Sequence, residues 1–504
     1  MLATFIINYT CRALFLHQLV ASLATYALLR LTWFYTARYR HYQLYRHYGV
    51  PGPRPTLLKG NCATLGIRPY TYEIDEALKH RYGRNFVLFL GDLPILTVTD
   101  LDILKKVFIE DTDNFKERSV PPLDTITIDS VLFAKHKDWK IYRKILSPSL
   151  NRYAIKGDYS TRSVRETVRL VIDYIDSRLE SDRVSGKLTV NIDVHNLMKS
   201  AALHMISAMA IKLSDTQITE YNRYTQYLDK FLSQIDGVLL HWIMSAPLIG
   251  TALNAFSRRI EVMQLGIFKS KLDMVIDNQH ATNDHLRSTN QQNQIVDTLI
   301  RLHHEGKIPR DAIVGNCMAI LLAAYDTTST TLAYLLWVLA KHDNIQDKLR
   351  SELIAHGTES EYLEQVINET FRLYPAVKSF TNRMASESVQ YKGLMIPKGT
   401  LVSFNTWLVH RDPDIWPDPM RFDPERFRTD KSHHPCAFAP FGFGERRCLG
   451  FELAMFKIRT MLCDIIIRYR VRLVSPIELK QYAYTQVLTK PLEKIMVQLE
   501  RVIC

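Results

Sequence analysis

The chain has 504 residues, 47% of them hydrophobic and 23% charged, which is the composition of a folded globular protein and excludes general disorder. Its net charge of +12 indicates an anionic partner, for which nucleic acid, an acidic membrane surface and an acidic protein are all candidates. The seven cysteines include no C-x-x-C pair, which gives no support to a zinc ribbon or a thioredoxin-like site and favours a reducing compartment.

Residues 1–36 predict a membrane anchor. A mostly apolar stretch, Ala13–Leu29, resumes at Leu31 and reaches spanning length if the charge of Arg30 extends to the interface. Aromatic and basic residues follow it, in the pattern of an interfacial belt on the cytoplasmic side. We expect an uncleaved anchor with the remaining chain in the cytosol. A mitochondrial transit peptide, which would also be rich in arginine and free of acids, is the alternative.

Residues 37–56 predict a basic, aromatic and proline-rich hinge, because its closing Pro-Gly-Pro-Arg-Pro cannot be helical. Residues 57–504 then predict one domain. A β-hairpin is expected over residues 86–99, followed by a short helix that Asp100 caps. Helical periodicity dominates from about residue 139 to residue 372, and short strand signals return after it. The predicted fold class is mainly α with a small β portion.

The longest uninterrupted helical pattern runs from Arg310 to His342. Its centre is the segment Ala323–Thr328, which reads A-A-Y-D-T-T. An acid followed by two β-branched hydroxyl residues is unusual in the middle of an apolar helix. Such hydroxyls also commonly bond to the preceding helical turn, so the segment has an ordinary structural interpretation as well.

The strongest signal is residues 441–450, F-G-F-G-E-R-R-C-L-G. Cys448 follows a glycine-rich turn and precedes an amphipathic helix, so that backbone N–H groups can face its sulfur and favour the thiolate. Gly444 and Gly450 would let the backbone approach a flat cofactor, and Arg446 would reach an anionic group on it. The glycine spacing fits no phosphate-binding loop, and a purely structural cysteine would not need these neighbours.

This segment resembles the haem-binding signature F-x-x-G-x-R-x-C-x-G of the cytochrome P-450 family at every fixed position. The resemblance implies that the chain binds haem b and has the cytochrome P-450 fold. It implies that Cys448 is the axial ligand of the iron and that four further residues contact the cofactor, namely Phe441, Gly444, Arg446 and Gly450.

Two further segments resemble the structural triad of this family. Glu369–Arg372 matches E-x-x-R, and Pro424–Phe427 matches P-E-R-F. Residues at i and i+3 share a helix face, so a Glu369–Arg372 pair alone would be a commonplace surface feature. The resemblance implies instead that Glu369, Arg372 and Arg426 hold the cysteine side of the fold together.

The segment Ala323–Thr328 is similar to the family pattern [AG]-G-x-[DE]-T-[TS], with Ala324 in place of the usual glycine. By this resemblance Asp326 and Thr327 deliver protons during catalysis. Trp139 and Arg143 match W-x-x-x-R, and Arg383 matches a further arginine of microsomal members. These three residues are implied to contact the haem propionates.

The resemblance, which is greatest to animal microsomal drug- and steroid-oxidising members, implies a monooxygenase of the endoplasmic reticulum membrane. It would oxidise a lipophilic sterol, fatty acid or xenobiotic, with electrons from NADPH–cytochrome reductase and with cytochrome b5 as a further candidate donor. A basic face that docks the reductase is expected from Arg447, Lys457, Arg459 and Arg468. Residues 238–256 predict either a second membrane contact or a buried helix pair.

Two other functions use the same fold or cofactor. A peroxide-rearranging isomerase or lyase would tend to lose the acid–threonine pair or carry an insertion in the cysteine loop, and neither departure occurs here. A haem sensor or carrier would bind gases without turnover. Nucleic-acid binding is the weakest interpretation of the charge, since the arginines are dispersed or lie beside the anchor. The sequence does not identify the substrate.

Overall fold

The computed structural model describes residues 2–57, 59–61, 64, 71–118, 129–151, 158–184, 186–211, 218–235, 265–266, 268–277, 295–476, 478–483 and 487–502. The proposed second membrane contact at 238–256 therefore lies outside the described residues. The described part is mainly helical with small β-sheets, as predicted.

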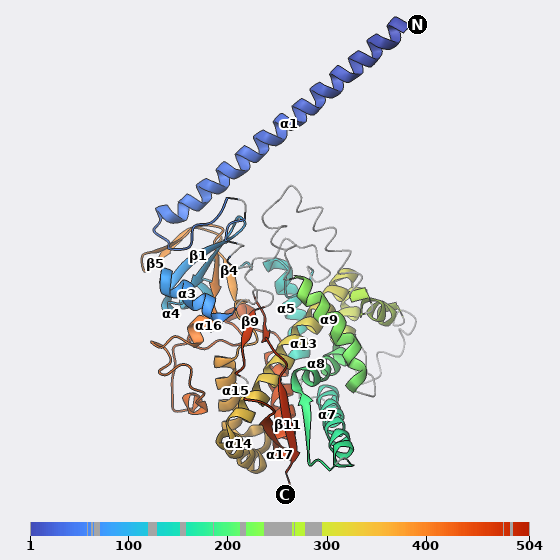
Figure 1. The fold of residues 1–504 in the computed structure, drawn as a ribbon, viewed down its shortest axis with the longest axis vertical. Helices are drawn as coiled ribbons and strands as arrows, with labels where there is room; N and C mark the ends of the chain where they lie inside the picture. Colours follow the sequence, from blue (N-terminus) through green and yellow to red (C-terminus); the bar gives the residue numbers. More distant parts are fainter. Residues whose placement is uncertain are drawn as a thin grey trace.

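The longer helices of the body lie around one central helix, α13, while α3, α4 and α16 lie with β1 and β4 near the end of the body that carries α1 (Figure 1). The helices are α3 (Tyr72–Tyr82), α4 (Leu101–Lys105), α5 (His136–Leu150), α7 (Asp158–Val184), α8 (Val194–Ile211), α9 (Tyr221–Ile235), α12 (Ile295–His304), α13 (Arg310–Lys341), α14 (Asp343–His356), α15 (Glu361–Leu373), α16 (Thr406–His410) and α17 (Phe451–Arg468).

Within the described ranges, the strands form four small sheets. The largest has the order β1 (Asn85–Leu90), β2 (Leu93–Val98), β7 (Leu401–Phe404) and β4 (Asn382–Met384). A second has the order β3 (Thr189–Asp193), β11 (Met496–Arg501) and β8 (Tyr469–Leu473). Two antiparallel pairs join β9 (Gln481–Ala483) to β10 (Thr489–Pro491) and β5 (Val389–Tyr391) to β6 (Leu394–Ile396).

The predicted hairpin and its following helix are confirmed. Strands β1 and β2 pair in antiparallel register from Asn85 opposite Val98 to Leu90 opposite Leu93. The Asp100 side chain accepts hydrogen bonds from the backbone N–H groups of Asp102 and Ile103, and so caps α4. A short π-helical turn, η1 (Lys106–Glu110), continues from α4 and packs beside the cysteine loop.

Helix α13 is buried on almost all sides, which explains why its sequence is apolar without an amphipathic stripe. Every residue from 312 to 339 is buried except Ala323, Ala324 and Thr327. Helices α8, α15 and α17 pack against it, and α17 begins directly after the cysteine loop. The core therefore fixes α13 and the cysteine loop relative to each other.

The N-terminal helix α1 (Leu2–His47) leaves the body as a long projection (Figure 1). Its last turns are part of the core, because Tyr42 and Tyr45 pack against Phe89, and the Tyr45 hydroxyl lies 2.6 Å from that of Thr400. Among the residues that the structure describes, none of the helices is long and apolar enough to cross a membrane.

Candidate cofactor site around Cys448

The cysteine loop is a tight turn whose backbone conformation favours glycine at two positions. The Cys448 N–H donates to the Phe441 carbonyl over 2.9 Å and closes the loop. Gly442 and Gly444 have φ angles of +74° and +59°, in the region that favours glycine. A Cβ atom on Gly444 would lie 2.6 Å from the Phe108 carbonyl oxygen. Gly444 thus serves the packing of the loop on η1, whereas a Cβ on Gly450 would meet nothing within 4 Å.

The Cys448 side chain is accessible, yet protein surrounds it, so its surface faces an internal space. Burial raises the pKa of the thiol, while a hydrogen bond from the Gly450 backbone and the charges of Arg143, Arg118 and Arg447 lower it. The predicted donors therefore act in the expected direction, but burial outweighs them. Coordination of the sulfur to a metal ion would replace the proton and restore the thiolate.

Arg446 is a buried cation whose hydrogen-bonding capacity is largely unused. Its Cζ lies 4.3 Å from the centroid of the Trp139 ring, and its Nη2 lies 3.9 Å from Glu117 Oε2. Within the described part of the chain, none of its three guanidinium nitrogens has a hydrogen-bond partner. Burial lowers the pKa of Arg446 to about 10. A buried guanidinium in this state fits an anionic group that is not part of the chain.

Arg118 lies beside Arg446 and was not predicted from the sequence. Its Nη2 donates to the Arg446 carbonyl over 2.9 Å, and its Cζ lies 4.7 Å from the centroid of the Phe380 ring. Its Nε has no partner among the described residues. Burial, and then the charges of Arg383 and Arg446, lower the pKa of Arg118 well below its usual value. No motif marks this residue, so only the folded structure identifies it.

The other predicted propionate contacts lie in the same place. Arg383 on β4 is buried, and both burial and the charge of Arg446 lower its pKa to about 10. Arg143, one turn after Trp139 on α5, donates through Nη1 to the Arg447 carbonyl over 2.7 Å. Arginines from four separate segments thus converge beside the thiol. This donor set fits a haem, which carries two carboxylates and an iron ion.

The acid–threonine segment lies at the one accessible edge of the centre of α13. Ala324 packs in the same apolar cluster as Leu449 and Leu453, which follow Cys448. The Thr327 hydroxyl donates to the Ala323 carbonyl over 2.7 Å, which is the ordinary structural bond of a helical threonine. Its oxygen remains available as an acceptor. Asp326 is only 2% exposed.

The predicted triad forms a buried network. The carboxylate of Glu369 binds Arg372 through two hydrogen bonds of 2.7 and 2.8 Å, and both residues are fully buried. Arg426 Nε lies 3.4 Å from Glu369 Oε1. Arg372 also donates to three backbone carbonyls of the 410–421 region. The triad therefore ties α15 to the segment that precedes the cysteine loop.

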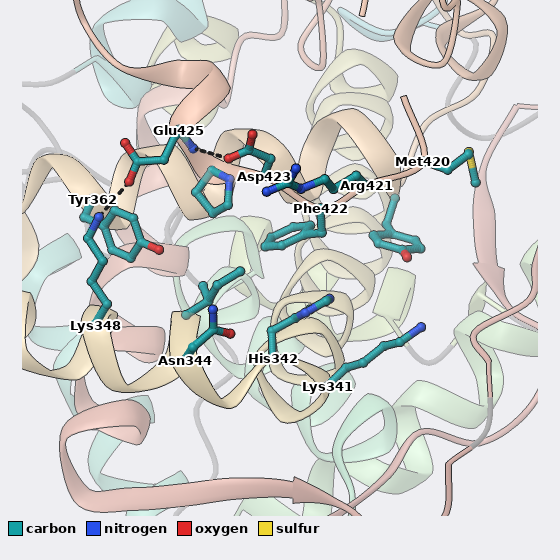
Figure 2. A pocket seen from close by; sticks show the side chains of 13 residues that line it. Lys341, His342, Asn344, Lys348, Tyr362, Met420, Arg421, Phe422, Asp423 and Glu425 are labelled. Carbon is teal, nitrogen blue, oxygen red and sulfur yellow. Dashed lines mark hydrogen bonds and ion pairs between the residues drawn. The ribbon is translucent and has the colours of Figure 1, made fainter. Parts of the chain in front are cut away.

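A surface cleft of about 560 Å³ lies next to this network, and not at Cys448. Figure 2 shows its lining, with Glu425 joined to Lys348 and its backbone N–H joined to the Asp423 carboxylate. The Asp423 N–H in turn donates to Glu369 over 2.8 Å. The charged groups of this cleft thus bind mainly to one another and, through Asp423, to Glu369. The cleft therefore stabilises the triad.

The predicted basic docking face is wrong at Lys457. Its Nζ is buried without a hydrogen-bond partner among the described residues. Lys457 lies four residues from Leu453 and from Met461, on the buried face of α17. Arg459 is bound to Glu364 and Arg468 to Asp464. Arg447 is exposed, although it lies over the Phe451 ring.

A thiol, a group of arginines with unused donors and an accessible edge of a long helix define the site of a haem-thiolate protein. Comparison with known proteins agrees, because a model of the cytochrome P-450 family matches residues 50–498. Cytochrome P-450 3A6 of Oryctolagus cuniculus is 26% identical over 95% of this chain and 98% of its own length. Cytochrome P-450 3A31 of Mesocricetus auratus is 27% identical over 96% of each chain.

The chain belongs to the cytochrome P-450 family. It is therefore a haem monooxygenase, an oxidoreductase whose cofactor is haem b with an axial cysteine thiolate. The predicted family is confirmed, and these relatives are animal proteins, as the resemblance implied.

Proposed function

We propose that this chain inserts one atom of O2 into a lipophilic substrate, a sterol, fatty acid or xenobiotic, and that Cys448 is the axial ligand. The observation that supports this best is the placement of Arg446, a buried cation with unused donors, in the loop that carries the accessible thiol. NADPH, through its cytochrome reductase, is the proposed source of electrons, with cytochrome b5 as a further candidate donor.

Each residue of the site has a proposed task. Haem b, when bound, supplies the activation of O2 and the transfer of oxygen. Arg118, Arg143, Arg383 and Arg446 hold its carboxylates, and Trp139 supports Arg446. Phe441 and Gly450 of the cysteine loop would complete the cofactor contacts, and Gly444 would support them by packing the loop on η1.

Proton delivery is assigned to the centre of α13. Asp326 would take protons from solvent and Thr327 would pass them on, because its hydroxyl can accept one hydrogen bond while it donates another. The accessible edge formed by Ala323, Ala324 and Thr327 is where oxygen and substrate would approach. Exclusion of water from this edge would strengthen the electrostatic effect of the arginines.

We also propose that α1 attaches the enzyme to the endoplasmic reticulum membrane, with the body in the cytosol. Large apolar side chains are exposed along the projecting part of the helix, among them Leu19, Leu23, Leu29 and Trp33. Such side chains favour a lipid environment over water. Extraction of a membrane fraction with alkaline carbonate tests this, and release of the full-length protein would contradict it.

The main test is a difference spectrum of the dithionite-reduced protein with CO, recorded for the wild type, Cys448→Ala and the matched control Cys463→Ala. We expect a strongly red-shifted Soret band that only Cys448→Ala abolishes. Turnover with NADPH and reductase is then measured on progesterone, lauric acid and 7-ethoxycoumarin. A band at the position of histidine-ligated haem would refute Cys448 as ligand, and CO binding without any oxidised product would favour the sensor or peroxide-rearranging alternatives.

A further inference from the structure

The Asp229 carboxylate on α9 binds two other helices at once. Its Oδ2 lies 2.6 Å from Nζ of Lys199 on α8, and its Oδ1 accepts a hydrogen bond of 3.1 Å from the Tyr325 hydroxyl on α13. The Lys199 side chain is 9% exposed and Tyr325 is fully buried, whereas the Asp229 side chain is one-third exposed. This bridge therefore joins α8, α9 and α13 at a single point.

The bridge meets α13 at the residue directly before Asp326. Tyr325 is buried although its neighbour Ala324 is accessible, so its side chain leaves α13 on the side of α8 and α9. A second polar contact follows five residues later, where Thr330 Oγ1 lies 3.4 Å from Nε2 of His195 on α8. Two polar contacts to α8 and α9 thus flank the proposed proton donor.

These contacts supply what apolar packing lacks. Burial of apolar surface is not directional, so in a helix that is apolar on nearly every side the polar contacts add a directional constraint on its rotation to the packing of the core. Hydrogen bonds and ion pairs have preferred geometries and so restrict that rotation. Burial, and then the charge of Asp229, raise the pKa of Tyr325, so its hydroxyl stays protonated and continues to donate.

We propose that Asp229, held in place by Lys199, is a positioning residue that fixes the rotation of the centre of α13 through Tyr325. In this way it determines where Asp326 and Thr327 lie relative to the reacting atoms. The proposal rests on the proposed function and adds a determinant of its proton delivery. A displacement of about 1 Å in such a group can reduce a rate on the order of 100-fold.

The chain provides a matched control for the test. In the apolar cluster that contains residues 332–339 of α13, the Tyr469 hydroxyl donates to Asp176 over 2.7 Å, and Asp176 also binds Arg501 over 2.5 Å. This is the same tyrosine–aspartate–cation arrangement, away from the centre of α13. Tyr325→Phe and Asp229→Asn are therefore compared with Tyr469→Phe, after CO spectra have confirmed that all variants hold the cofactor.

Two measurements decide the proposal. We expect Tyr325→Phe and Asp229→Asn to speed hydrogen–deuterium exchange of the amides of residues 320–331 about tenfold. We also expect them to lower product per NADPH at least threefold, with a matching increase in hydrogen peroxide. Asp229→Glu should restore part of the coupling, which is the product formed per NADPH consumed. Tyr469→Phe should change neither the exchange rate nor the coupling.

Unchanged coupling in either variant, or an equal loss in Tyr469→Phe, would overturn the assignment of Asp229 as a positioning residue. Failure of the proposed function looks different, because the wild type itself would then oxidise no probe. In that case the exchange rates alone decide whether the bridge fixes α13, and wild-type exchange rates in both variants would overturn it.

Discussion

The guanidinium of Arg446 lies over the indole ring of Trp139, with Cζ 4.3 Å from the ring centroid. A cation over an aromatic face is stabilised without the use of its N–H groups. Since Trp139 belongs to α5 and Arg446 to the cysteine loop, the contact also joins two parts of the site. The arrangement keeps a buried charge in place while its donors remain available for a ligand.

Substitution of Arg446 should therefore reduce cofactor retention. Charge-assisted hydrogen bonds contribute about 1.5–3 kcal/mol each, so Arg446→Ala should weaken haem binding by about tenfold or more. The haem-to-protein ratio and the rate of haem transfer to apomyoglobin measure this. Arg447→Ala removes an exposed neighbour that acts on Cys448 only through its charge, so it should reduce haem retention less than Arg446→Ala while it slows reductase-supported turnover. Equal haem loss in both variants would count against the role of Arg446.

Asp326→Asn should lower product formation about 100-fold, which is within the usual range for loss of a general acid. The substitution keeps the size of the side chain, so the CO spectrum should be unchanged. Asp311→Asn provides the comparison, because Asp311 is exposed in the first turn of the same helix. A wild-type rate in Asp326→Asn, measured with the most rapidly oxidised probe, would exclude the assigned proton transfer.

Lys457→Met should stabilise the fold. Burial lowers the pKa of Lys457 to about 7 from 10.5, so between these values the unfolded state binds more protons than the folded state. The free energy of unfolding of the wild type should rise with pH from about 7 to about 10.5. Below pH 7 Lys457 is charged in the folded state too, so the full free-energy cost of the buried charge lowers the stability. At about 1.4 kcal/mol per pKa unit, this cost is on the order of several kcal/mol.

Thermal unfolding midpoints at pH 6 and pH 9 test whether the protonation of Lys457 controls the stability of the fold. Lys457→Met should unfold at a higher temperature than the wild type, and the difference should be smaller at pH 9. Lys137→Met, at an exposed position, should behave like the wild type. A difference that is the same at both pH values would show that the charge of Lys457 is not responsible.

Glu369→Gln should destabilise the protein by about 3–5 kcal/mol, because it leaves Arg372 buried without its counter-charge. Lys348→Ala breaks an exposed pair with Glu425 in the neighbouring cleft, and should cost at most about 1 kcal/mol. Chemical denaturation monitored by the haem Soret band compares the two. Similar losses for both would mean that the buried triad is no more important than a surface pair.

The sequence predicts the elements whose signals are local. The hairpin, the Asp100 cap, the central helix and the pairing of Glu369 with Arg372 follow from spacing along a few residues, and the structure contains them all. The role of that pair as a structural element and not a surface pair was implied only by the family resemblance. The convergence of the Cys448 loop with distant arginines was available only through the family resemblance, since no local pattern brings separate segments together.

Three features were missed for identifiable reasons. Arg118 contacts a residue 328 positions away along the chain, and Asp229 contacts one 96 positions away. The neighbours of Arg118 and Asp229 along the chain carry no signal for these contacts. Lys457 was assigned to the surface because of its charge. Lys457 is four residues from both Leu453 and Met461, which places it on the buried face of α17. The helical periodicity therefore predicts the burial of Lys457 better than its charge does.

The burial of Tyr42 and Tyr45 in the body has a mechanical consequence for α1. A helix of 46 residues is about 70 Å long, and this one continues without a break into the core. The orientation of its N-terminal end is therefore coupled to the orientation of the body, because no loop interrupts the helix between Leu2 and His47. Whatever surface holds its far end therefore also sets the tilt of the whole enzyme, and with it the direction from which a ligand or an electron donor can arrive.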